Sequence, residues 1–130
     1  LCEEYAPNAK IVSHTYDLVK PRPKSAKFVA GLIATGPWIY PYLVQKGIPE
    51  ALHLPVISVL LNSLEERLLE TAADPIAGQR LHVVATQGTL RPGHGSDWKD
   101  EIHPTPSGFK RLTRIYYAKM RELEPRLPAF

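Results

Sequence analysis

Cysteine is almost absent from this sequence, which has a single residue of that type, Cys2, in 130. One cysteine cannot form a disulfide within the chain, so the fold cannot depend on such cross-links. Cysteine-rich zinc sites are excluded for the same reason. His94, Asp100 and His103 could be imagined as metal ligands, but their spacing matches no standard zinc signature. The scarcity of cysteine does not separate a cytoplasmic from an exported protein, because many exported enzymes also lack disulfides.

Long apolar runs and a strong charge of one sign are also missing. No apolar run reaches the ~18–20 residues that a membrane-spanning helix needs. The formal net charge is only +3, which does not indicate a dedicated nucleic-acid-binding protein. What remains is an ordinary globular composition, 44% hydrophobic and 22% charged, in a chain long enough for one domain and short for two. We therefore expect residues 1–130 to belong to a single domain.

The apolar pattern alternates between strands and helices. It predicts strands over residues 10–16 and 81–86, and helices over 36–47, 55–73 and from Thr105 onward. Residues 28–34 could form either a short strand or a buried loop. Strands that alternate with helices indicate an α/β fold with a parallel sheet.

Each of the two longer helices has an apolar stripe that we expect to be buried. The stripes consist of Ile57, Leu61, Leu64, Leu68 and Ala72 on the first helix, and of Phe109, Leu112, Tyr116, Met120 and Leu123 on the second. Thr105 is a favourable N-cap, and Pro106 suits the first helical position. The pattern places Arg111 toward water.

Two or three strands make a poor parallel sheet, which normally has more strands and helices on both faces. Residues 1–5 also resemble the end of a helix. We therefore expect this chain to be the C-terminal portion of a larger domain. The first strand would then expose an edge that suits an N-terminal part of the same domain or a second copy of the chain.

The residues with the clearest chemistry are Asp100 and His103, which lie between the second strand and the last helix. Ligands of open α/β sheets bind beyond the carboxyl ends of the strands, where this loop is expected. In a turn before a helix, this spacing lets the carboxylate accept a hydrogen bond from one imidazole nitrogen. A histidine held in this way can act as a general base toward a serine hydroxyl.

The segment DEIHPTPSGF at residues 100–109 resembles the last sequence block of the SGNH (GDSL) hydrolases. The segment AKIVSHTYD at residues 9–17 and the Gly-Pro-Trp triplet at residues 36–38 are also similar to features of some bacterial members. The resemblance implies a flavodoxin-like three-layer α/β/α fold with a parallel sheet. It also implies hydrolysis of a carboxylic ester, acetyl or short acyl, of a small molecule or carbohydrate, without a cofactor or metal. His103 would be the general base and Asp100 its orienting acid.

The chain departs from that family in one respect, because it contains no Gly-Asp-Ser block. The family's nucleophilic serine lies in such a block near the N-terminus, and its backbone contributes to the oxyanion hole. The triplet Gly95-Ser96-Asp97 is no substitute, because it immediately precedes the Asp–His block. We therefore predict that the nucleophile lies outside this chain, and that these 130 residues alone have no esterase activity.

Four further residues are candidates for a substrate pocket. They are Tyr16, Asp17, Trp38 and Trp98. Tyr16 and Asp17 follow the first strand, although a turn-forming role is the favoured interpretation of Asp17. Trp38 could line an apolar pocket or pack in the core, and core packing is favoured. Glu101 is expected to be solvated.

Two functions of other classes stay open. A basic loop with Lys20, Arg22, Lys24 and Lys27 could bind phosphate or nucleic acid, although a solvated loop is favoured and nucleic acid is not the expected partner. A non-catalytic half-domain that acts as an interaction or complementation piece is the other alternative.

Overall fold

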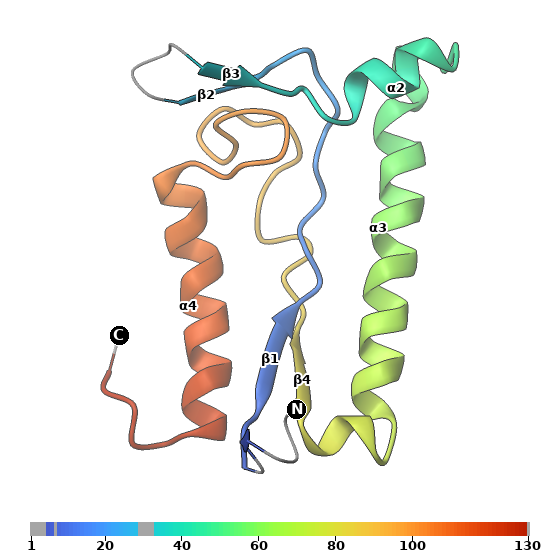
Figure 1. Ribbon diagram of the computed structural model, residues 1–130. Coiled ribbons are helices and arrows are strands. Elements are labelled where there is room, and N and C mark those ends of the chain that lie inside the picture. The colour runs from blue at the N-terminus through green and yellow to red at the C-terminus, as the bar shows by residue number, and fades with distance from the viewer. Residues whose placement is uncertain (1–4, 7, 29–32, 130) are drawn as a thin grey trace.

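In the computed structural model, which describes residues 5–6, 8–28 and 33–129, two parallel strands lie between two long helices (Figure 1). Strand β1 (Ile11–His14) pairs with β4 (Leu81–Val84), with Ile11 opposite Leu81 and His14 opposite Val84. Helices α3 (Glu50–Ala73) and α4 (Pro106–Leu123) flank this pair on opposite sides. The prediction of mixed helices with a small parallel sheet is confirmed at this level.

A second small sheet lies beyond the carboxyl ends of the parallel strands (Figure 1). Strands β2 (Ala26–Phe28) and β3 (Ile33–Thr35) pair in antiparallel fashion. Residues 28–34, for which the sequence allows a short strand or a buried loop, thus contain strand residues at both ends. Residues 29–32 lie outside the described part of the chain. The predicted helix end at the start of the chain also falls largely outside it. The short helix α2 (Tyr40–Gln45) and the 3-10 turn η2 (Ala77–Gln79) complete the elements.

Helix α3 begins at Glu50 and contains Pro55, although the prediction placed Pro55 at the helix entry. A proline in the interior of a helix lacks one backbone donor and therefore disfavours continuation. Contacts of His53 hold the helical turn that precedes Pro55. The His53 ring is buried, its Nε2 lies 2.8 Å from the Ile48 carbonyl oxygen, and it packs edge-on against Tyr40. Tertiary packing thus extends the helix beyond its local sequence signal.

The core is small and lies above the carboxyl ends of β1 and β4. Its buried apolar members are Val19, Leu43, Ile57, Leu90 and Trp98. On the face of α3 that the sequence predicts to be buried, Ile57 is buried. Leu64 is 45% exposed, so the predicted burial of Leu64 is wrong. Leu60, one turn before Leu64 on the same side of the helix, is 61% exposed. The described part of the chain therefore leaves one apolar face of α3 uncovered.

Helix α4 begins as the sequence predicts, because the Thr105 hydroxyl accepts a hydrogen bond from the Gly108 N–H at 3.0 Å. The predicted burial of Phe109 is wrong, since this side chain is 52% exposed. The reason lies in Gly108, the buried residue of α4, which packs against the Asp97 carbonyl so closely that a Cβ would lie 2.5 Å from that oxygen. The next residue then points roughly 100° away from this contact.

Candidate active site

The central pair of the candidate site is Asp100 and His103, in the loop between β4 and α4. The His103 Nδ1 atom lies 2.9 Å from Asp100 Oδ1 and 3.0 Å from Oδ2. The backbone N–H of His103 donates to the same carboxylate at 2.9 Å, and that of Ile102 at 3.1 Å. The pair therefore has the contact that its spacing predicts. Because the carboxylate accepts at Nδ1, any proton transfer to a substrate falls to Nε2.

Burial and electrostatics differ sharply between the two partners. The Asp100 side chain is 2% exposed and that of His103 is 41% exposed. Burial alone would raise the pKa of the Asp100 carboxyl, but hydrogen bonds from the N–H groups of His103 and Ile102, together with the imidazole, hold this pKa below its usual value. Asp100 is therefore an anion at neutral pH, which favours the Nδ1–H form of His103 and would stabilise an imidazolium.

A surface hollow adjoins the pair and has a volume of about 250 Å³. Its lining consists of Lys99, Asp100, His103, Pro104, Pro106 and Phe109. The exposed Phe109 ring, which the sequence placed in the core, is thus one wall of this hollow. It is a candidate pocket residue that the periodicity of α4 concealed.

Tyr16 fixes this loop from the side of β1. Its hydroxyl donates to the Ile102 carbonyl at 2.7 Å, and its backbone has a φ of +60°, which non-glycine residues rarely adopt. Burial and the nearby Asp100 charge raise the pKa of the Tyr16 phenol, so it stays a donor. Tyr16 therefore touches the loop that holds the candidate dyad, and its role as a pocket residue stays a prediction.

Arg22 does not belong to a solvated basic loop, and that part of the prediction is wrong. Its guanidinium donates to three backbone oxygens, those of Gly93, Trp98 and Asp100, at 3.0, 3.1 and 2.6 Å. The planar fork of arginine can satisfy several carbonyls at once. The basic patch loses this charge to the interior, which weakens the case for an anion site built on it.

Glu101 is also misjudged by the sequence, which predicted a solvated side chain. It is 1% exposed, and its carboxylate accepts hydrogen bonds from the backbone N–H groups of Trp38, Ile39 and Tyr40. These groups precede and begin α2, so the carboxylate satisfies donors that have no partner within the helix. No local pattern around Glu101 reveals this, because its partners lie some sixty residues earlier in the chain.

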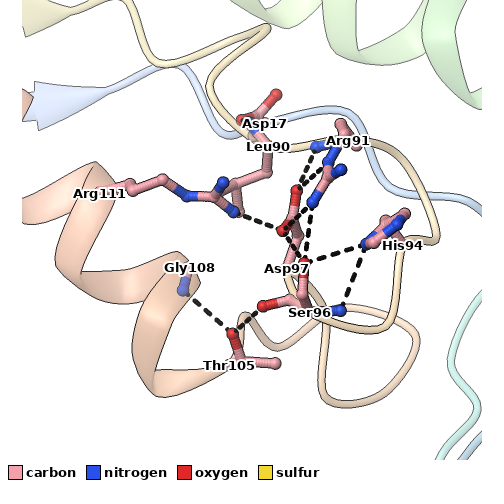
Figure 2. A network of polar contacts seen from close by, with 9 residues as sticks. All are labelled: Asp17, Leu90, Arg91, His94, Ser96, Asp97, Thr105, Gly108 and Arg111. Atoms are coloured by element: carbon pink, nitrogen blue, oxygen red, sulfur yellow. Dashed lines mark hydrogen bonds and ion pairs between the residues drawn. The ribbon is translucent and has the colours of Figure 1, made fainter.

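Asp97 occupies the centre of a second polar cluster, in which it contacts both Arg91 and Arg111 (Figure 2). Its buried carboxylate is contacted by Arg91, whose Nε is 3.1 Å away, and by Arg111, whose Nη2 is 2.5 Å away. The prediction that Arg111 faces water is therefore wrong. The Arg91 hydrogen bonds, followed by those of Ser96 and Arg111, outweigh burial and lower the pKa of Asp97 far below its usual range.

Ser96 takes part in the same cluster rather than in the dyad contacts. Its hydroxyl donates to Asp97 Oδ1 at 2.6 Å, accepts from Arg91 Nη2 at 2.9 Å, and lies 3.0 Å from His94 Nδ1 (Figure 2). A hydroxyl whose proton is directed at a carboxylate is poorly placed to give that proton to an imidazole. This geometry is consistent with the expectation that Ser96 is not a nucleophile for His103.

Of the remaining predicted pocket residues, Trp38 lies beside His103, whereas Trp98 and Asp17 are buried. Trp38 lies beside the dyad, with its ring edge-on to that of His103 and the ring centres 5.2 Å apart. Trp98 is 2% exposed and packs in the core, so its predicted place in a pocket is wrong. Asp17 is 3% exposed and accepts from the N–H groups of Leu18, Gly88 and Leu90. Its carboxylate therefore organises the loop after β4.

Neither a metal site nor a membrane span is found in the described part of the chain. No group of three or more His, Cys, Asp or Glu side chains there could hold a metal ion. None of its helices is long and apolar enough to cross a bilayer. Comparison of the chain with protein-family models, with curated proteins and with solved structures finds no match.

Proposed function

We propose that this chain supplies the acid–base pair of a serine-dependent ester hydrolase of the SGNH type. The observation that carries the proposal is the contact of the His103 Nδ1 with the buried Asp100 carboxylate, whose pKa is lowered, beside a surface hollow. The sequence block around the pair is the second support. In this account Asp100 orients His103, and the nucleophilic serine comes from a polypeptide segment outside the printed sequence.

The proposed reaction has two stages. As the serine oxygen attacks the ester carbonyl, its proton passes to His103 Nε2, and the imidazolium then protonates the leaving alcohol oxygen. Water next attacks the acyl-serine, gives a proton to His103, and the same proton returns to the serine oxygen as the carboxylic acid leaves. The substrate class is an ester of an acetyl or short acyl group on a small molecule or carbohydrate. No cofactor takes part.

The proposed parent fold is a flavodoxin-like three-layer α/β/α domain, of which residues 1–130 form the C-terminal portion. Helices on both sides of the parallel pair support this proposal, as does the position of the dyad loop after β4. Further parallel strands would continue the sheet beside β1. The antiparallel β2–β3 pair would then lie beyond one end of that sheet.

The test uses the protein expressed from the whole reading frame that encodes this chain. It should hydrolyse p-nitrophenyl acetate or butyrate, and His103→Ala should lower kcat by roughly 10³–10⁶-fold. Asp100→Asn should lower kcat by about 10⁴-fold, because the amide favours the wrong imidazole tautomer. His94→Ala, in an exposed histidine of the neighbouring loop, is the matched control and should retain activity. An active His103→Ala protein would contradict the proposal.

One observation favours a second candidate, an interaction piece that associates with another copy of itself. Leu60 and Leu64, one turn apart on the same side of α3, expose apolar side chains next to a hollow of about 450 Å³ that Leu60 also lines. Exposed apolar surface of this kind commonly marks an association site. Size-exclusion chromatography with light scattering should then show a dimer that Leu60→Lys dissociates. A monomer at all concentrations would contradict this candidate.

A further inference from the structure

The strongest feature that the proposed chemistry does not yet use is the buried carboxylate of Glu101, which lies in sequence between Asp100 and His103. Its Oε1 accepts from the Tyr40 N–H at 2.7 Å, and its Oε2 accepts from the Ile39 N–H at 2.8 Å and from the Trp38 N–H. Three backbone donors converge on one anion, and such charge-assisted bonds are shorter and stronger than neutral ones. The segment that begins at Trp38 is therefore tied directly to the dyad loop.

Trp38 connects this tie to the imidazole. Its ring meets that of His103 edge-on, at 77° and with centres 5.2 Å apart. The indole in turn lies over Gly36, where a Cβ would come within 2.6 Å of the ring. Two contacts thus restrict the position of the indole. Gly36 lies against the ring, and the backbone N–H of Trp38 donates to Glu101.

The half-exposed His103 ring has contacts with both residues that flank it. Asp100 holds Nδ1 with both carboxylate oxygens, which fixes the tautomer and that edge of the ring. The Trp38 edge adds a second contact. Small errors in the position of a general base can reduce turnover strongly, with roughly 10²-fold losses for a displacement of about 1 Å.

We propose that Glu101 is a positioning residue that orients the His103 imidazole by holding Trp38 against it. The catalytic consequence rests on the proposed ester hydrolysis, whereas the orientation itself does not. A carboxylate is suited to this role because its two oxygens can accept all three N–H groups. Glutamine keeps one acceptor oxygen, but its amide N–H₂ would face the Tyr40 N–H, a donor against a donor.

The test measures ring contacts in the printed chain by NMR. Nuclear Overhauser effects between the Trp38 ring protons and the His103 ring protons should be strong, with the His103 signals assigned from a His103→Asn variant. Glu101→Ala should abolish these effects, and Glu101→Gln should weaken them. Asp74→Asn is the matched control, because the Asp74 carboxylate also accepts backbone N–H groups, those of Ile76 and Ala77, at the start of η2. The control should leave the His103–Trp38 effects unchanged.

A second variant covers the possibility that Glu101→Ala fails to fold. Gly36→Ala should displace the indole without removing the carboxylate, and should reduce the same Overhauser effects. If the His103–Trp38 effects persist at full strength in a folded Glu101→Ala or Glu101→Gln chain, the positioning role is overturned.

Catalytic measurements separate this inference from the proposed function. In the protein of the whole reading frame, Glu101→Gln should lower kcat by roughly 10-fold or more and leave KM within about twofold. A KM increase with unchanged kcat would overturn the positioning role. If no ester is hydrolysed at all while the Overhauser effects still depend on Glu101, the proposed function fails and the orientation of His103 by Glu101 stands.

Discussion

The guanidinium of Arg22 donates to the backbone oxygen of Asp100 at 2.6 Å, so a distant residue holds the carboxylate that contacts His103 in place. The same Nη2 atom contacts the Trp98 oxygen, and Nη1 contacts that of Gly93. Three points of one loop are thus fixed by a single side chain. Because the loop has little regular secondary structure of its own, we expect its conformation to depend strongly on Arg22.

Replacement of Arg22 tests that dependence. Arg22→Ala should lower the free energy of unfolding by about 2–3 kcal/mol, since it removes charge-assisted hydrogen bonds and leaves carbonyl groups without their donor. Arg22→Lys should recover part of this loss, because an ammonium cannot present the same planar fork. Urea unfolding measures both. Lys24→Ala, in an exposed neighbour, is the control and should change stability by less than about 0.5 kcal/mol. Equal effects of Arg22→Ala and Lys24→Ala would contradict the structural role.

The Asp97 cluster predicts an acid-dependent loss of stability. The Arg91 hydrogen bonds hold the pKa of Asp97 well below its usual value, whereas in the unfolded chain this group titrates near ~4. Below that pH the unfolded state binds a proton that the folded state does not, so the stability from Asp97 is complete above ~4 and falls as the pH decreases further. Asp97→Asn should flatten this decline and destabilise the chain at pH 7.

Urea unfolding between pH 7 and pH 2.5 measures the effect. Asp100 and Glu124, whose pKa values are also lowered, should leave a residual slope in the Asp97→Asn variant. Glu66→Gln, in an exposed residue of α3, is the control and should keep the wild-type slope. An Asp97→Asn variant that loses stability in acid as steeply as the wild type would show that Asp97 is not the main cause.

The exposed position of Phe109 gives a third prediction, through comparison with Leu112 on the same helix. Phe109→Ala should lower the free energy of unfolding by less than about 1 kcal/mol, because most of the ring is already in water. Leu112→Ala should cost about 1–2 kcal/mol, since Leu112 packs against the buried core cluster. Thermal or urea unfolding measures the difference. A larger loss for Phe109→Ala than for Leu112→Ala would reverse this assignment.

Features that depend on local sequence could be predicted. Helix α4 starts where Thr105 and Pro106 place it, and the Asp100–His103 contact forms across a spacing of three residues. The two parallel strands lie within the predicted β-rich runs, 10–16 and 81–86, and are shorter than these runs. Each of these signals needs only neighbours in the chain, so pattern and chemistry suffice.

The contacts that hold the candidate site could not be predicted in this way. Arg22, Glu101 and Arg111 each appeared to be a solvated charge, and each binds a partner that the fold brings near. Periodicity also misplaced Phe109, because the close approach of Gly108 to the Asp97 carbonyl sets the rotation of α4. Long-range pairing of charges leaves no local pattern, and for this reason the sequence predicts the Asp100–His103 contact but not the contacts that hold its loop.

Absence of activity in the isolated chain is a fourth prediction. The printed 130 residues should release p-nitrophenol from p-nitrophenyl acetate no faster than their His103→Ala variant, because a base without its nucleophile gives little catalysis. Stopped-flow absorbance measures both the burst and the steady rate. A burst stoichiometric with the isolated chain would mean that one of its own side chains is the nucleophile.

The most direct test of the account is fluorophosphonate labelling of the protein expressed from the whole reading frame. Such probes react with a serine that an adjacent histidine activates, whatever the acyl specificity of the enzyme. We expect a single labelled serine outside residues 1–130, with labelling lost in His103→Ala, strongly reduced in Asp100→Asn and retained in His94→Ala. Absence of labelling in the wild-type protein, or labelling that persists in His103→Ala, would contradict the assignment of His103 as the general base of a serine hydrolase.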